Sequence, residues 1–414
     1  MKKQLLYIFA LAVIAGIFTG CRQRGDVFLD PNDDLSMRYN TYAGQFDVIW
    51  RGLNTHYVFW SEDPTNWDEV YKTMHPMFAR LDSVYDADGT VADSVAFVRL
   101  YAAATATLID HHMTLRWKDV HTQKQYVYVP GLMEVNQRDY AYGGNYVKDS
   151  LKAAINNYMQ IGLLDEGGRW GELNDIENFY GLLLLENGKR IAYLWQSGYD
   201  MIGSLNVTPA NEKESQFIKN IDRWMQSCTQ DSQLAGIILD NRNNYGGKVR
   251  DLSLVIGAFI QEPLYYADLR YKEGPGRYEY TDWFADYVDT CTLYPRRDLQ
   301  AESIPFVVLV NAHSISLGEA SAQVAKSLPT SYVIGERTFG AHGQLIPIPS
   351  YFYDGTFGNK NGKHYVYTSN MQTRFVGEEV LEGKGITPDK EIIQRDKGLN
   401  AAMEEAIEYI KSKQ

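Results

Sequence analysis

The second half of this chain alternates between short apolar runs and longer segments with helical spacing. Runs such as Leu234–Leu239 and Phe306–Val310 contain almost only apolar residues, which is typical of buried strands. Between the runs, apolar residues recur every three or four positions, as on one face of a helix. This alternation predicts an α/β sheet. The predicted elements are strands at 190–195, 234–239, 306–310 and 332–335, and helices at 212–228, 252–260 and 319–327.

The segments on either side of this alternation predict further units. Residues 39–114 carry apolar side chains at helical spacing, Phe46, Ile49, Trp50 and Leu53 among them, and predict an N-terminal helical domain. Residues 115–186 alternate in polarity and contain glycine pairs, which predicts a small mixed module. We therefore expect a mixed fold of class α/β (α+β), with the core at 187–395 and a closing helix within 396–414.

Charge excludes one large class of partner. The 414 residues carry a formal net charge of -12, and no basic stripe is visible along the chain. Binding to nucleic acid requires clustered basic residues that displace counterions from phosphates. We therefore expect no nucleic-acid partner.

The amino end predicts export. Lys2 and Lys3 precede an apolar run from Leu5 to Phe18, which is shorter than the roughly 20 residues of a membrane span. Thr19 and Gly20 before Cys21 resemble the bacterial lipoprotein cleavage box, which implies a signal peptide at 1–20, lipidation of Cys21 and a polar tether at 21–38. The alternative is a plain secretory signal that is cleaved elsewhere. We expect a lipid-anchored protein of the cell envelope, at the outer membrane on its periplasmic side.

The cysteines and histidines predict no metal site. After lipidation of Cys21 only Cys228 and Cys291 remain, and in an oxidising compartment the two could form a disulfide. No histidine pair has helical metal-ligand spacing, because His111 and His112 are adjacent and their side chains diverge on a regular element. We expect neither a metal nor a cofactor.

One strand-to-helix turn carries a candidate nucleophile. The strand at 306–310 ends in small residues and a helix starts again just after Ser316. Such a turn lifts a hydroxyl out of the sheet and leaves free backbone N–H groups that stabilise developing negative charge. The alternative is an ordinary loop in which Ser316 caps the helix. A second strand end carries Gly246 and Gly247, where a backbone N–H can approach a substrate carbonyl without a Cβ in the way.

Together with the strand and loop at 333–340, these segments resemble the carboxy-terminal processing (tail-specific) and tricorn-core serine peptidases. The resemblance extends upstream to Asp110-His111-His112, which is similar to the family's Asp-x-His motif. It implies a ClpP/crotonase-like β-α-β core, Ser316 as nucleophile, and an oxyanion hole from the N–H of Leu317 with that of Gly246 or Gly247. No carboxylate-binding loop of a PDZ domain is found in 115–186.

The chain departs from the better known branch of that family at the general base. The processing peptidases use a lysine where this chain has Ala341, and an alanine cannot abstract a proton. The tricorn-like branch implies a histidine, for which His112 is the candidate and His342 the rival. The resemblance further implies a late glutamate that orients the site, and Glu382 is the candidate.

Three other polar residues have structural interpretations. Asp240 and Arg242 are expected to brace their loop as a salt bridge, and Glu319 to accept N–H groups at the helix start.

The combined expectation is an exported serine endopeptidase that acts on protein or peptide through an acyl-enzyme and is tethered to a membrane. One alternative is a catalytically silent relative that binds peptide, glycan or a hydrophobic ligand in the same cleft. Another is a structural lipoprotein, which would expose a large apolar patch.

Overall fold

The computed structural model describes residues 40–88, 96–138, 144–160, 164, 168–294, 304–345, 355–359 and 364–414. The predicted signal peptide, Cys21 and the tether lie outside these ranges. Among the described residues, no helix has both the length and the apolar character needed to cross a membrane.

The largest sheet has seven strands and carries the predicted α/β alternation. Its order is β14-β10-β9-β6-β5-β4-β3. The strands from β14 to β5 are parallel, and β4 and β3 add an antiparallel edge. The bounds are β3 (Arg169–Leu173), β4 (Ile176–Leu184), β5 (Arg190–Gln196), β6 (Leu234–Asp240), β9 (Phe306–Val310), β10 (Ser331–Gly335) and β14 (Lys390–Glu391).

Helices cover both faces of this sheet, which explains why β6 and β9 at its centre are buried at every position and almost entirely apolar. On one face, Leu239 and Val308 pack with α8 (Glu212–Thr229) and α10 (Leu317–Ala325). On the other face, Ile238 and Val307 pack with α6 (Gly144–Gln160) and α12 (Ala401–Ser412). Successive strand residues thus alternate between two cores.

The predicted helix at 252–260 is wrong. The chain forms a 3-10 turn η2 (Val249–Asp251), one turn of helix α9 (Leu252–Val255) and a second 3-10 turn η3 (Gly257–Phe259). The backbone of Gly257 lies so close to Asp289 that an added Cβ would be 2.2 Å from the Asp289 carbonyl oxygen. At this close approach the chain forms the 3-10 turn η3 instead of a second regular helical turn. The short helices α7 (Met201–Leu205) and α11 (Gln394–Lys397) complete this half.

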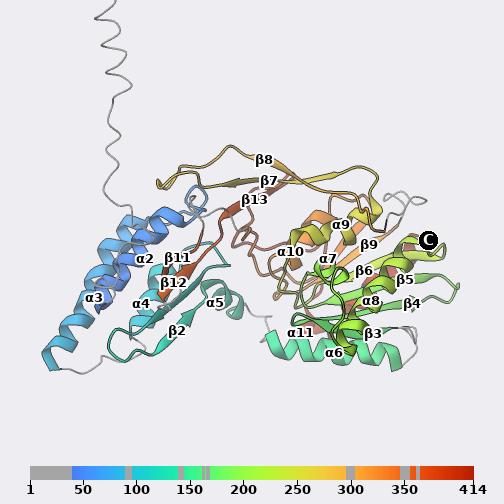
Figure 1. The fold of residues 1–414 in the computed structure, drawn as a ribbon, viewed down its shortest axis with the longest axis horizontal. Helices are drawn as coiled ribbons and strands as arrows, with labels where there is room; N and C mark the ends of the chain where they lie inside the picture. Colours follow the sequence, from blue (N-terminus) through green and yellow to red (C-terminus); the bar gives the residue numbers. More distant parts are fainter. Residues whose placement is uncertain are drawn as a thin grey trace, which may run out of the picture.

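The front part combines the expected helices with a sheet that the sequence did not predict. Figure 1 shows its helices at one end of the molecule and the seven-stranded sheet at the other. The helices are α2 (Tyr42–His56), α3 (Trp67–Asp88), α4 (Ala96–Thr105) and the short α5 (Pro130–Asn136). They adjoin the sheet β11-β12-β1-β2, made of β1 (Thr114–Lys118), β2 (Gln125–Tyr128), β11 (Phe357–Asn359) and β12 (His364–Tyr367).

The expected module at 115–186 is therefore divided between two sheets. Its first strand β1 pairs with β12, where Arg116 lies opposite Tyr365, and with β2 on its other side, whereas β3 and β4 extend the seven-stranded sheet. The cause is long-range pairing, which no local pattern in 115–186 encodes.

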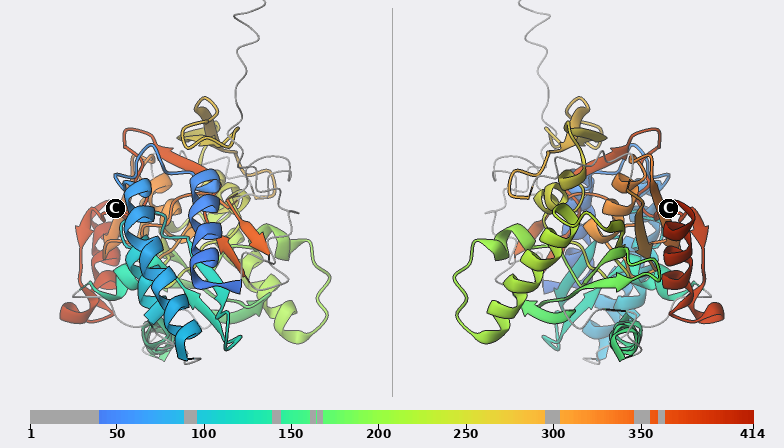
Figure 2. Two further views of the ribbon diagram at one scale, coloured as in Figure 1. Left: turned by 90° about the vertical axis from the view of Figure 1, so that its left-hand side faces the viewer. Right: turned by 90° about the vertical axis from the view of Figure 1, so that its right-hand side faces the viewer.

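A third sheet spans the two ends. It has the order β13-β7-β8, with β7 (Leu264–Tyr271), β8 (Phe284–Val288) and β13 (Met371–Phe375). It runs along the top of the molecule in Figure 1, and Figure 2 shows the front helices and the far end from the two sides. Cys228 and Cys291 are buried in the same cluster but are not joined in a disulfide.

Candidate active site

Ser316 lies between β9 and α10 in a conformation that an L-residue rarely adopts. Its φ is 55° and its ψ -126°, and it immediately precedes the first residue of α10. A non-glycine residue in such a region costs of the order of 1–3 kcal/mol, and persists only where its surroundings hold it. Here the N–H of Ser316 donates to Glu319 Oε1 at 3.2 Å, and the N–H of Ile315 donates to the Asn244 carbonyl at 2.8 Å. Ser316 and Glu319 form a capping box at the helix start. A cap alone does not require this strained backbone, which marks Ser316 as a functional candidate as well.

Gly246 provides the space beside this serine. Its φ is 91°, and an added Cβ would lie 2.6 Å from Ser316 Cβ and 2.8 Å from the Leu317 nitrogen. The N–H of Gly246 already donates to Asn244 Oδ1 at 2.8 Å. Of the two glycines considered for an oxyanion hole, this leaves Gly247 as the candidate donor beside Leu317.

Glu319 fixes the loop that follows β10. Its fully buried carboxylate accepts the N–H groups of Gly340 and Ala341 at 2.9 and 2.6 Å, and the hydroxyl of Thr338. Burial raises the pKa of this carboxyl, and the three hydrogen bonds oppose that rise. Together with its bond to the Ser316 N–H, this confirms that Glu319 satisfies N–H groups at the helix start.

The two adjacent histidines have different surroundings. His111 Nδ1 is 2.9 Å from the Phe339 carbonyl oxygen, which ties His111 to the loop after β10. His112 lines the same cavity as Ser316, its Nδ1 is 3.5 Å from Ser369 Oγ, and its Nε2 is buried without a hydrogen-bond partner among the described residues. Burial lowers the pKa of His112, whereas the charges of Asp110 and Glu319 act to raise it. A carboxylate-flanked imidazole with a free Nε2 can accept a proton.

His342, the rival base, lies in the same cavity in a less polar setting. Neither of its ring nitrogens has a hydrogen-bond partner within the described part of the chain, and Nε2 is 3.6 Å from Glu319 Oε2. Burial, with a smaller effect of His111, lowers the pKa of His342 to about 3. A ring that resists protonation this strongly is the weaker of the two bases.

Glu382 braces two loops through its backbone contacts. Its carboxylate accepts the N–H groups of His111, His342 and Gly343 at 3.0, 2.7 and 2.7 Å. Burial, with the nearby charge of Asp110, raises its pKa well above the usual value. Glu382 thus holds the His111 turn against the loop at 342–343, and these contacts show a positioning group.

The ligand atoms of Asp110, His112 and Glu382 lie within 4.8 Å of one another, a spacing that a metal ion could bridge. However, each carboxylate is already surrounded by donors: Asp110 accepts bonds from the N–H groups of His112 and Ser369 and from two hydroxyls, and Glu382 accepts three N–H groups. Protons that point at these oxygens would repel a cation. The trio is built as a hydrogen-bond network.

The site opens into a cavity of about 510 Å³. Ser316, His112, His342 and the oxyanion candidates Gly247 and Leu317 all line it. The rest of its wall is largely apolar, with Leu252, Tyr266, Ala320, Val324 and Phe375. This arrangement can hold an apolar side chain next to a nucleophile.

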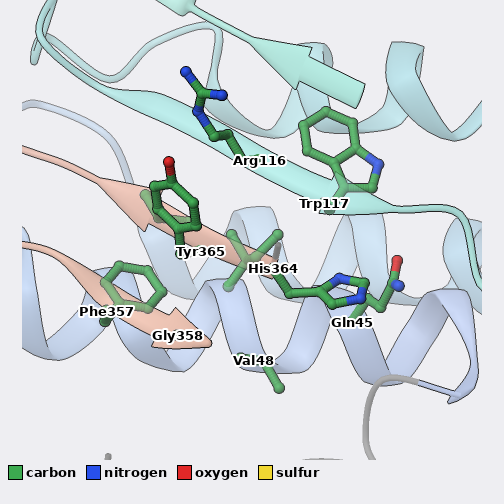
Figure 3. A pocket seen from close by; sticks show the side chains of 10 residues that line it. Gln45, Val48, Arg116, Trp117, Phe357, Gly358, His364 and Tyr365 are labelled. Atoms are coloured by element: carbon green, nitrogen blue, oxygen red, sulfur yellow. The ribbon is translucent and has the colours of Figure 1, made fainter. Parts of the chain in front are cut away.

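Two other cavities lack this combination. One of about 740 Å³ reaches His111 and Glu382 from the side of the β7–β8 ribbon but is not lined by Ser316. The other, of about 20 Å³, lies under the front sheet between Gln45, Trp117 and His364, as Figure 3 shows. It has room for about one water molecule and is not lined by any candidate site residue.

Two further sequence predictions concern structural residues. Asp240 and Arg242 form the expected salt bridge, 2.6 Å long and fully buried. Ala341 packs in a small apolar cluster with Val135, Ala312 and Phe339, so this position offers no amine.

Sequence reasoning missed Ser369, which contacts both Asp110 and His112. Thr368 and Ser369 lie in no motif, and their contact with Asp110 spans more than 250 positions, so a single sequence carried no signal for them. Asp110 itself belongs to the Asp-x-His motif, so its carboxylate could have been considered as a partner of His112 from the sequence.

Comparisons with known proteins bear on the family and the fold. Residues 201–392 match the model of peptidase family S41. The fold is similar to that of a candidate peptidase from Parabacteroides merdae, with a TM-score of 0.61 and 18% identity over 89% of this chain and 96% of that one. It is also similar to mature CPAF, with a TM-score of 0.52 and 13% identity over 91% of this chain and 98% of that one. No curated protein is significantly similar to this chain in sequence.

The matched segment contains Ser316, both oxyanion candidates, His342 and Glu382, and the front part contributes His112 to the same cavity. The mixed α/β architecture with a helical front part and several sheets is that of the family fold. Both the sequence match and the arrangement of the elements confirm the resemblance drawn from the motifs, and the segment at 201–392 is the part of the chain that matches peptidase family S41.

Proposed function

We propose that this protein is an exported serine endopeptidase with a Ser-His centre. The observation that carries the proposal is the strained Ser316 at a helix start, in one cavity with the buried Nε2 of His112, which has no hydrogen-bond partner among the residues that the structure describes. Strain of this kind is typical of positions where a nucleophile is presented.

In the proposed reaction, His112 Nε2 takes the proton of Ser316 Oγ as that oxygen forms a bond to the peptide carbonyl carbon. The N–H groups of Leu317 and Gly247 donate to the resulting oxyanion. The C–N bond then breaks, His112 gives its proton to the leaving amine, and water hydrolyses the acyl-enzyme by the same steps. His112 is favoured over His342 because Asp110 and Glu319 stabilise its protonated form.

The cavity wall suggests which side chain precedes the cleaved bond. Leu252, Val324 and Phe375 form an apolar surface next to Ser316, whereas Lys248 at the rim is paired with Asp200 at 2.9 Å. Burying apolar side-chain area is favourable by about 25 cal/mol per Å². We therefore propose a preference for a large apolar residue on the amino side of the bond.

The amino end supports the cellular part of the proposal. The apolar run at 5–18 and Cys21 support export and a lipid anchor in the cell envelope, which would hold the peptidase at a membrane.

The test is labelling of the full-length protein in detergent with a fluorophosphonate probe that reacts with activated serines. The wild type and His342→Ala are expected to label, while Ser316→Ala and His112→Ala are not. Circular dichroism verifies that each variant is folded. Absence of labelling in a folded wild type would support the alternative, a silent relative that binds peptide or another ligand in this cavity.

A further inference from the structure

Ser369 and Asp110 form a buried pair that contacts His112 but does not line the cavity. Ser369 lies in the turn between β12 and β13 and is fully buried, as is Asp110. The N–H of Ser369 donates to Asp110 Oδ2 at 2.7 Å, and its hydroxyl donates to Asp110 Oδ1 at 3.0 Å. The hydroxyl proton of Ser369 therefore points at the Asp110 carboxylate.

His112 contacts both members of this pair. Its N–H donates to Asp110 Oδ1 at 2.9 Å, and its ring Nδ1 lies 3.5 Å from Ser369 Oγ. Because the Ser369 proton points at Asp110, the oxygen of Ser369 presents a lone pair to the ring, and only a protonated Nδ1 can use it. The neutral ring then carries its proton on Nδ1 and leaves Nε2 free.

The loop at 342–343 holds Ser369 in place. An added Cβ at Gly343 would lie 2.4 Å from Ser369 Oγ, so the backbone of this loop packs directly on the hydroxyl. Glu382 in turn binds the N–H of Gly343. The hydroxyl is therefore fixed by its surroundings, as a residue that orients a base must be.

We propose that Asp110 and Ser369 are positioning residues that set the tautomer and orientation of His112 through an Asp110–Ser369–His112 chain of hydrogen bonds. This inference rests on the proposed function, in which His112 is the base. It assigns the orienting role to an aspartate and a serine, while Glu382 braces the loops around them. The 3.5 Å contact shortens when the imidazolium forms, because the protonated ring is the stronger donor.

The charges that face His112 favour this assignment. Burial lowers its pKa, Asp110 and Glu319 act to raise it, and His342 and His111 act to lower it further. Of these groups, Asp110 is the one that also accepts the His112 N–H and the Ser369 hydroxyl.

The kinetic test compares Ser369→Ala with Thr368→Val. Both remove one hydroxyl bond to Asp110, but only Ser369 touches the ring of His112. Ser369→Ala is expected to lower kcat about 100-fold with KM changed less than about twofold, and Thr368→Val to lower kcat less than about fivefold. Equal losses in the two variants would overturn the proposal, since they would show a structural role alone.

The pH profile supplies a readout that a structural role would not move. Asp110→Asn removes the charge that stabilises the imidazolium, so the acid limb of kcat/KM shifts to lower pH. A lower rate with an unshifted limb would overturn the assignment of Asp110.

A spectroscopic measurement separates this inference from the proposed function. In Ser316→Ala protein with ¹⁵N-labelled histidine, neutral His112 is expected to be protonated at Nδ1, and Ser369→Ala should add the Nε2-protonated form. If the wild type is inert to the serine probe, the proposed function fails. The tautomer of His112, measured in the Ser316→Ala protein, still tests the hydrogen-bond chain in that case. If the wild type reacts but the tautomer is unchanged by Ser369→Ala, only the chain is refuted.

Discussion

Replacing Gly246 by alanine should inactivate the proposed peptidase by displacing Ser316. An alanine at φ 91° carries a backbone penalty of about 1–2 kcal/mol. Its Cβ would also lie 2.6 Å from Ser316 Cβ and 2.8 Å from the Leu317 nitrogen, distances that no real Cβ keeps. To relieve these contacts, the serine turn must move by roughly 1 Å, and a displacement of that size can reduce a catalytic rate by about 100-fold.

Gly188→Ala is the matched control. Gly188 has a similar φ of 80°, yet an added Cβ there would meet nothing within 4 Å. It carries the backbone penalty alone, so its melting temperature should fall while its activity stays near that of the wild type.

The assay is the second-order rate of fluorophosphonate labelling, measured well below the melting temperature of each variant. Gly246→Ala is expected to label about 100-fold more slowly than Gly188→Ala. Labelling of Gly246→Ala within threefold of the wild type would refute the reasoning, because the turn would then have absorbed the methyl group without moving the nucleophile.

Three further predictions follow from the same structure. Burial lowers the pKa of His112 below its usual 6.5, and a general base must be neutral. The acid limb of kcat/KM should therefore have its midpoint below pH 6.5. A midpoint above that value in a pH series would contradict the environment described for His112. Val324→Phe should fill the apolar wall and lower kcat/KM for peptides with leucine before the cleaved bond at least about tenfold relative to alanine peptides, and an unchanged ratio would place the side-chain pocket elsewhere. Asp240→Asn leaves the Arg242 guanidinium buried without its anion and should reduce the free energy of unfolding by about 3–5 kcal/mol in urea titrations. Glu69→Gln, which breaks an exposed ion pair with Lys72, is the control and should change the urea midpoint of unfolding little.

The parts of the fold that the sequence predicted are those with a local cause. Strands β6 and β9 are covered on both faces, so each appears as one continuous apolar run. Helix α8 has an apolar stripe and an Asn211 cap, and its observed range differs from the prediction by one residue at its end. The division of residues 115–186 between two sheets was not predictable, because β1 pairs with β12, which lies about 250 positions away in the sequence.

The same distinction applies to the site. Ser316 and Glu319 lie on one turn, so a short segment predicts both the strained serine and the carboxylate that accepts its N–H. Only the structure could exclude Gly246 as an oxyanion-hole donor, because its N–H already donates to the side chain of Asn244. Ser369 was invisible to sequence reasoning, since its contact with His112 joins residues 257 positions apart.

The long span of these contacts has a consequence for the newly made chain. His112 belongs to the front part, Ser316 to the last quarter of the sequence, and the Asp110–Ser369 contact closes over 259 positions. A nascent chain that ends before residue 369 therefore lacks a complete site, even if its front helices have already folded. Domains commonly fold as units while synthesis proceeds, so an early, active fragment would endanger its own chain and its neighbours. If the proposed site is the active one, the order of the residues along the polypeptide itself delays its assembly until almost all of the chain has been made.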